Sequence, residues 1–184
     1  MTWIVLIVVA IFVILLVALY NGLVQLRVRS EGAWSDVDVQ LKRRHDLIPN
    51  LVEAVKDYMS YEQETLTKVT EARAAAISAG NQGPEAQAQA ENVLTGALKS
   101  LFAVVENYPD LKANQNVMSL QEELTATENK IAFARQFYND SVLTYNNKIQ
   151  TVPSNLIAGM FNFSPRQFFA APEEDKAVPK VDLR

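Results

Sequence analysis

The sequence contains no cysteine and only one histidine, His45, among its 184 residues. Disulfide bonds, thiolate metal sites and cysteine nucleophiles are therefore excluded. Di-iron sites in helical bundles need paired Glu-x-x-His motifs, so a single histidine excludes that class as well. We expect no catalytic centre, no cofactor and no bound metal ion.

Residues that interrupt helices are also scarce, with six Gly and seven Pro in the whole chain. Good helix formers such as Ala, Leu, Glu and Gln are abundant, and few positions need unusual backbone angles. The formal net charge of −4 offers no general attraction to phosphate backbones, which need a clustered basic surface. The composition predicts an all-α protein with no nucleic-acid partner.

A long apolar run stands at the N-terminus. Every residue from Trp3 to Leu19 is apolar, and further apolar residues follow Tyr20. About 20 such residues are enough for a helix to cross the roughly 30 Å hydrocarbon core of a bilayer. A cleaved signal peptide is the alternative, but no Lys or Arg precedes this long run and no small-residue cleavage site closes it. We predict that residues 1–24 form one transmembrane anchor, which makes the lipid bilayer a partner.

The basic residues around this anchor are unevenly distributed. No Lys or Arg precedes it, whereas Arg27, Arg29 and the basic run 42–44 follow it. Positively charged flanks usually remain in the cytoplasm. The asymmetry predicts a short N-terminus outside and the rest of the chain in the cytoplasm.

Beyond the anchor, apolar residues recur at spacings of three and four, which is typical of amphipathic helices. Asp46 can cap a helix, and Pro49 falls in its first turn, where the missing N–H costs little. Short connections imply antiparallel neighbours and an up-down four-helix bundle over residues 25–152. The predicted helices are residues 25–45, 47–79, 84–107 and 117–150.

Residues 153–171 form an aromatic-rich apolar segment that is too short to span a membrane. Its phenylalanines are Phe161, Phe163, Phe168 and Phe169. The segment either contacts the membrane surface or a neighbouring subunit, or it caps the end of the bundle. Residues 172–184 are charged and punctuated by proline, and we predict that this tail is disordered.

A charged surface is predicted at the end of the bundle far from the anchor. At about 1.5 Å per residue, the basic run lies roughly 27–30 Å beyond the anchor and out of reach of lipid. It forms either a docking surface for a protein partner or a solvated turn, with Glu106 and Asp110 as partners of the arginines. The candidate surface residues are Lys42, Arg43, Arg44, His45 and Asp110.

Four further charged residues lie on or beside the apolar stripes of the predicted helices: Glu62, Arg73, Glu128 and Arg135. Buried charges need partners, so these residues form either an internal polar network or a contact between subunits. In the other interpretation they lie at the edges of the stripes and their long side chains reach solvent.

Several strings of residues, in the same order along the chain, resemble the LemA family. They are Ala33–Leu41, Lys42–Val52, Tyr108–Asn114, Leu120–Thr125 and Glu128–Ala132. The resemblance covers nearly the whole chain. It implies a bacterial inner-membrane protein with an N-terminal span and a four-helix domain, and it implies no established biochemical activity.

These observations predict a non-enzymatic, membrane-anchored interaction or scaffold protein that forms homo-oligomers. The alternative is a sensor or hydrolase subunit that uses carboxylates of the bundle, such as Glu62 and Glu128. That alternative needs carboxylates that converge on a pocket and have perturbed pKa values. Carboxylates that instead pair with arginines favour the interaction protein.

Overall fold

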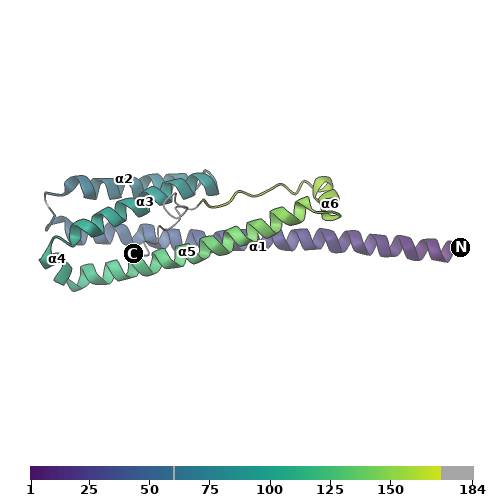
Figure 1. The fold of residues 1–184 in the computed structure, drawn as a ribbon, viewed down its shortest axis with the longest axis horizontal. Helices are drawn as coiled ribbons and strands as arrows, with labels where there is room; N and C mark the ends of the chain where they lie inside the picture. The colour runs from purple at the N-terminus through teal and green to yellow at the C-terminus, as the bar shows by residue number, and fades with distance from the viewer. Residues whose placement is uncertain (60, 171–184) are drawn as a thin grey trace, which may run out of the picture. The chain divides into compact units, whose positions relative to one another are not determined.

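The computed structural model describes residues 1–59 and 61–170. All regular secondary structure in these residues is helical. The all-α prediction is confirmed. The predicted disorder of residues 172–184 concerns a segment outside the described residues. The helices in the described part are α1 (Thr2–Lys56), α2 (Gln63–Ala79), α3 (Pro84–Val105), α4 (Pro109–Ala113), α5 (Gln115–Gln150) and α6 (Ser154–Met160) (Figure 1).

The chain divides into two compact units. Unit 1 consists of residues 1–37 and 134–167, and the described part of unit 2 consists of residues 38–133 without residue 60, together with residues 168–170. The long helices α1 and α5 each contribute to both units. Unit 2 also contains α2, α3 and α4, whereas α6 belongs to unit 1.

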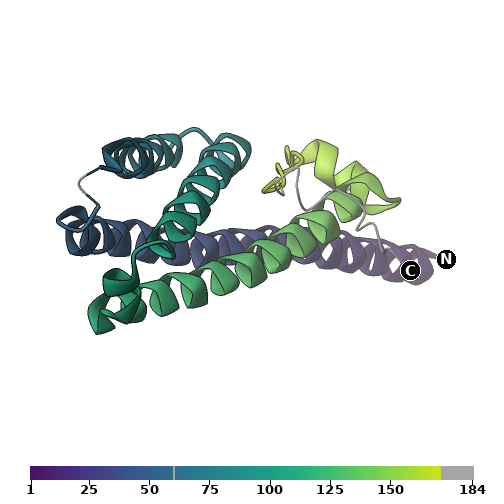
Figure 2. The same cartoon turned by 60° about the vertical axis from the view of Figure 1, so that its left-hand side comes forward.

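The core of unit 2 is built from the apolar stripes of its helices. Helices α2 and α3 lie side by side (Figures 1 and 2). Small residues of α2 take part in this core, which lets the helix backbones approach closely. The buried residues include Ile48, Leu51 and Val55 of α1, Ala72 and Ala76 of α2, Leu94 and Leu101 of α3, and Leu124 of α5.

The core of unit 1 joins α1, α5 and α6. Leu23 of α1 packs with Tyr145 and Ile149 of α5 and with Ile157 and Ala158 of α6. Around this centre lie four partly buried residues, Leu16, Leu19, Leu26 and Phe163. Because three of these and Leu23 recur along α1 at helical spacing, one stripe of α1 forms its side of the core.

The N-terminal part of α1 presents its apolar side chains to the surroundings. Residues 1–15 are all exposed. An 18-residue window of α1 has a mean hydropathy of 3.3, and none of it is buried within the protein. A soluble core helix buries such a surface, so the described chain contains one helix that is long and apolar enough to cross a membrane.

The structure differs from the predicted helix boundary near His45. Helix α1 continues through Pro49 to Lys56, so the segment predicted as one helix over 47–79 is the end of α1 followed by α2. Proline lacks the N–H that would bond the carbonyl four residues earlier, which is that of His45. Arg73 of α2 donates its Nε–H to this carbonyl at 2.7 Å. The guanidinium of Arg73 thus satisfies the carbonyl that Pro49 leaves without a backbone donor.

Candidate functional site

A buried group of charged side chains connects three helices of unit 2. Arg44 of α1 is only 1% exposed, and its guanidinium bonds Glu91 of α3 and Glu128 of α5. The same guanidinium donates to the hydroxyl of Thr95 on α3 at 2.9 Å. His45, the next residue of α1, also contacts Glu91. We call these five residues the Arg44 cluster.

Glu91 is the most confined acid of the Arg44 cluster. Its Oε1 lies 2.8 Å from Nε2 of His45, and its other carboxylate oxygen accepts from Arg44. Burial is the largest single influence and by itself raises the pKa of Glu91. The contact with His45 and the charge and hydrogen bond of Arg44 together outweigh burial, so the pKa of Glu91 lies below the ordinary value of 4.5. Glu91 is therefore ionised at neutral pH and balances the charge of Arg44.

The second acid of the cluster lies at its edge. The side chain of Glu128 is 43% exposed, whereas that of Glu91 is 2% exposed. Beside Glu128 is a pocket of about 200 Å³, lined by Thr95, Leu98, Lys99, Phe102, Leu124, Thr125, Glu128 and Asn129. Glu128 is the sole carboxylate of that lining. The pocket thus reaches the cluster at Thr95 and at one acid, Glu128, and both are bound to Arg44.

This arrangement does not favour acid–base chemistry. A general acid needs a carboxyl group that holds its proton near neutral pH, but the pKa of Glu91 is lowered. In residues 1–59 and 61–170, no three His, Asp or Glu side chains are grouped closely enough to hold a metal ion. The chemical consequence of the cluster is an ionic link between α1, α3 and α5.

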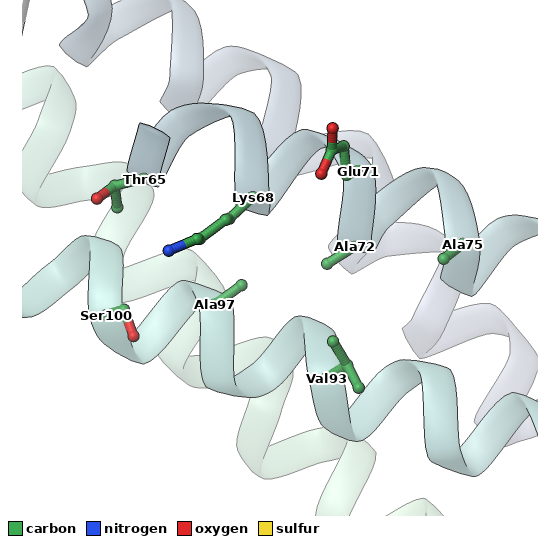
Figure 3. Close-up of a pocket in the computed structure, with 8 residues that line it drawn as sticks. All are labelled: Thr65, Lys68, Glu71, Ala72, Ala75, Val93, Ala97 and Ser100. Carbon is green, nitrogen blue, oxygen red and sulfur yellow. The ribbon is translucent and has the colours of Figure 1, made fainter. Parts of the chain in front are cut away.

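A groove runs between α2 and α3 in the same unit (Figure 3). Its volume is about 570 Å³, and its lining residues are Thr65, Lys68, Glu71, Ala72, Ala75, Val93, Ala97 and Ser100. Lys68 extends across the groove in Figure 3, whereas Glu71 points away from it. Lys68 also pairs with Glu64 on its own helix, at 2.7 Å. The groove is therefore lined mainly by small apolar side chains, with one cation extending across it.

The predicted charged surface contains two kinds of residue. Lys42, Arg43 and Asp110 are exposed, as a surface requires. Arg44 and His45 are buried, so their assignment to a docking surface is corrected. One turn of α1 carries both kinds, because adjacent helical residues point about 100° apart.

The arginines also have other partners than those expected. Arg43 pairs with Glu123 on the exposed surface, and Arg44 pairs with Glu91 and Glu128. Neither Glu106 nor Asp110, the expected partners, is among these. Because α1 continues to Lys56, these residues lie within a helix and not at the predicted turn; Arg43 is solvated there, whereas Arg44 is buried.

Two residues of the predicted polar network, Glu128 and Arg73, bond different groups on the same turn of α1. Glu128 belongs to the Arg44 cluster, and Arg73 bonds the carbonyl of His45. Glu62 precedes α2 as its N-terminal flanking residue. Arg135 belongs to unit 1, whereas the other three belong to unit 2.

Sequence reasoning missed Glu91, although its position carries a signal. Ala88, Glu91, Leu94 and Leu98 follow one another at spacings of three, three and four, and all four are buried. A carboxylate in such a stripe requires a cation from a facing helix. The stripe thus indicated a buried ion pair on α3, but not the identity of the arginine.

The four predicted aromatic contact residues belong to both units. Phe161 is exposed and Phe163 is partly buried in the core of unit 1, and their rings lie 4.8 Å and 5.8 Å from that of Tyr20 between centroids. Phe168 and Phe169 belong to unit 2, where Phe168 is exposed and Phe169 is buried. The exposed apolar surface is therefore smaller than four phenylalanines implied.

Side chains of α5 hold the backbone of residues 164–167 in unit 1. The hydroxyls of Tyr145 and Tyr138 donate to the carbonyls at the two ends of this segment, at 3.0 and 2.8 Å. Between them, the amide of Asn146 pairs with both the N–H and the carbonyl of Arg166, each at 2.9 Å. Each of these contacts uses a backbone group of residues 164–167, so the side chains of this segment take no part in them.

The lowered pKa of Glu91 predicts an acid-sensitive contribution to stability. Because the folded-state pKa is below 4.5, this contribution is present in full above that pH and is lost as the pH falls through the folded value. We expect Glu91→Gln to be less stable than the natural chain at pH 7, and the difference to shrink below about pH 4.5. Urea unfolding of both proteins at a series of pH values measures it. A difference that does not vary with pH contradicts the assignment, because the other acids titrate in both proteins.

Comparison with known proteins gives the family. The sequence model of the LemA family matches residues 33–183. The chain belongs to the LemA family. Protein LemA of Metamycoplasma hominis is 28% identical over 178 residues, which cover 95% of this chain and 78% of that protein. Magnetosome protein MamQ 2 of Paramagnetospirillum magneticum is 27% identical to this chain, and magnetosome protein MamQ of Magnetospirillum gryphiswaldense is 24% identical. Each match covers 86% of this chain and 67% of the relative.

The strings by which this chain resembles the LemA family contain much of the site. Residues 42–52 include Arg44, His45 and Pro49, and residues 128–132 begin with Glu128. Glu91 lies outside these strings, although the family match spans it. Arg44 thus lies in a segment that resembles the LemA family, whereas its most buried partner, Glu91, lies in the middle of the chain, outside these segments.

Proposed function

We propose that this LemA-family chain is a non-enzymatic, membrane-anchored interaction protein that associates with copies of itself. One observation carries the proposal: α1 begins with an exposed apolar stretch and continues into unit 2. In that unit, the buried charged side chains pair with one another. Glu91 and Glu128 both bind Arg44. This pairing supports the interaction protein over the hydrolase or sensor subunit, which would need carboxylates free to act on a substrate.

The proposed anchor is residues 1–24, with the bilayer as its partner. The basic residues that follow it, Arg27 and Arg29, are exposed, as residues beside lipid headgroups would be. They support a short N-terminus outside and the helical part in the cytoplasm, at the inner membrane of a bacterium.

Anchoring also favours association between copies. Chains held in one membrane are concentrated in two dimensions, so a weak contact is enough to bring them together. Of the phenylalanines expected to mediate this contact, Phe163 and Phe169 are packed within their own units. Phe133 of α5, 73% exposed on unit 2, is the better candidate, because exposed aromatic rings are enriched at interfaces.

A single-cysteine experiment tests association and orientation together. The chain has no cysteine, so Phe133→Cys introduces the only thiol. In bacterial cells that make the full chain, we expect a membrane-permeant bismaleimide to link Phe133→Cys chains into covalent dimers. Tyr61→Cys is the matched control, because Tyr61 is another aromatic residue of unit 2 and is 95% exposed. A membrane-impermeant maleimide should label neither variant until the cells are lysed.

The two parts of the proposal fail separately. Equal dimer yields from Phe133→Cys and Tyr61→Cys would show random collision and contradict association through this face. Labelling of either thiol in intact cells would contradict the cytoplasmic location and leave the association result standing.

A further inference from the structure

Helix α6 packs against the part of α1 that we assign to the membrane. Ile157 and Ala158 of α6 share a core with Leu23, and Leu16 and Leu19 pack against the same core. All three leucines lie within residues 1–24. From position 16 to position 23 a helix rises about 10 Å, so α6 lies beside roughly the last 10 Å of the proposed span.

Helix α6 and the residue that follows it carry three large apolar side chains that are exposed. Leu156 is 66% exposed, Met160 75% and Phe161 55%. Together these three side chains form an apolar face that is costly to expose to water. Removing such surface from water is favourable by about 25 cal/mol for each Å² of apolar area. The ring of Phe161 also lies against Tyr20, an amphipathic residue suited to the level of the headgroups. The apolar face is thus continuous with the surface of the anchor.

The charges around this face are mainly positive. In residues 24–31 and 146–167 the cations are Arg27, Arg29, Lys148 and Arg166, against one carboxylate, Glu31. Glu31 pairs with both Arg27 and Arg166. The excess is local, since the whole chain carries a net charge of −4. A basic segment of this kind is attracted to anionic lipid headgroups. Each Lys or Arg near the membrane surface contributes about 1 kcal/mol to binding.

We propose that α6 and Phe161 are a second membrane contact, inserted into the headgroup and acyl boundary of the leaflet that faces the helical part of the chain. The occupant of the apolar face is lipid, and the hydrogen bonds of α5 to residues 164–167 hold the following segment on the water side. This inference rests on the proposed membrane anchor. Unit 1 is then attached to the membrane at two points, because α1 crosses the bilayer while α6 lies in its surface.

Spin labels on single cysteines in the full chain test the proposal. We would reconstitute Met160→Cys in vesicles of phosphatidylcholine and phosphatidylglycerol, and measure the access of oxygen and of a water-soluble nickel chelate to the label. Phe12→Cys reports the proposed span, and Tyr61→Cys reports water. Met160→Cys should resemble Phe12→Cys, with oxygen access and a several-fold lower nickel access than Tyr61→Cys.

Each other outcome has its own meaning. Nickel access at Met160→Cys with protection at Phe12→Cys would overturn the insertion of α6 and leave the anchor intact. Nickel access at both positions would overturn the anchor and this inference with it. Protection of Met160→Cys from oxygen as well as nickel would show that a second copy covers α6, which also overturns contact with lipid.

Discussion

Arg44→Met is expected to destabilise the folded chain by about 3–5 kcal/mol, because it leaves a buried carboxylate without its cation. Glu91 is almost fully buried, and His45 would be its one remaining partner in the Arg44 cluster. Methionine fills much of the volume of the arginine stem, so the loss of charge rather than a cavity dominates. Urea unfolding of the full chain in mild detergent, followed by circular dichroism, measures the effect.

The neighbouring arginine provides the control. Arg43 also pairs with a glutamate, Glu123, but both side chains are exposed. Exposed pairs contribute about 0–1 kcal/mol, so Arg43→Met should change stability little. Combining Arg44→Met with Glu91→Leu should recover much of the loss, because no unpaired buried charge then remains. Equal effects of the two single arginine variants would contradict the role assigned to the cluster.

Arg73→Met is expected to destabilise the chain by about 1–3 kcal/mol, because it leaves the carbonyl of His45 without a donor. That carbonyl lacks its helical partner because residue 49 is proline. In a Pro49→Ala background the backbone N–H at position 49 can bond the carbonyl of His45, so the same replacement should cost less. The four proteins form a double-mutant cycle in urea unfolding.

The cycle separates this role from ordinary packing of the arginine. A coupling of about 1 kcal/mol between positions 49 and 73 is expected if Arg73 substitutes for the missing N–H. If Arg73→Met has the same effect in both backgrounds, the guanidinium stabilises the chain through other contacts.

Together these contacts concentrate the polar links of unit 2 on one turn of α1. Arg44 binds α3 and α5, and the carbonyl of His45 receives Arg73 of α2. Apolar packing tolerates small shifts, whereas a buried ion pair requires one geometry. The turn therefore carries polar links from α1 to three other helices.

Local properties of the sequence were enough for the helices and for the one that is long and apolar enough to cross a membrane. The apolar run from Trp3 to Leu19 indicates a spanning helix because membrane crossing depends on length and hydropathy, which any window of residues reveals. The three- and four-residue spacing of apolar positions predicts amphipathic helices for the same reason, since each spacing lies within about one turn. The LemA-family strings likewise indicated the family before any contact was known.

The tertiary structure decided which charges are buried and where the first helix ends. Arg43 and Arg44 are alike in sequence, but they point about 100° apart on α1, so one faces solvent and the other faces Glu91 on another helix. Helix α1 passes Pro49, and the carbonyl that this proline leaves without a backbone donor accepts from Arg73 of another helix. Both outcomes depend on which helix faces meet, and that is decided by the packing of the whole unit and not by the residues within a turn of each site.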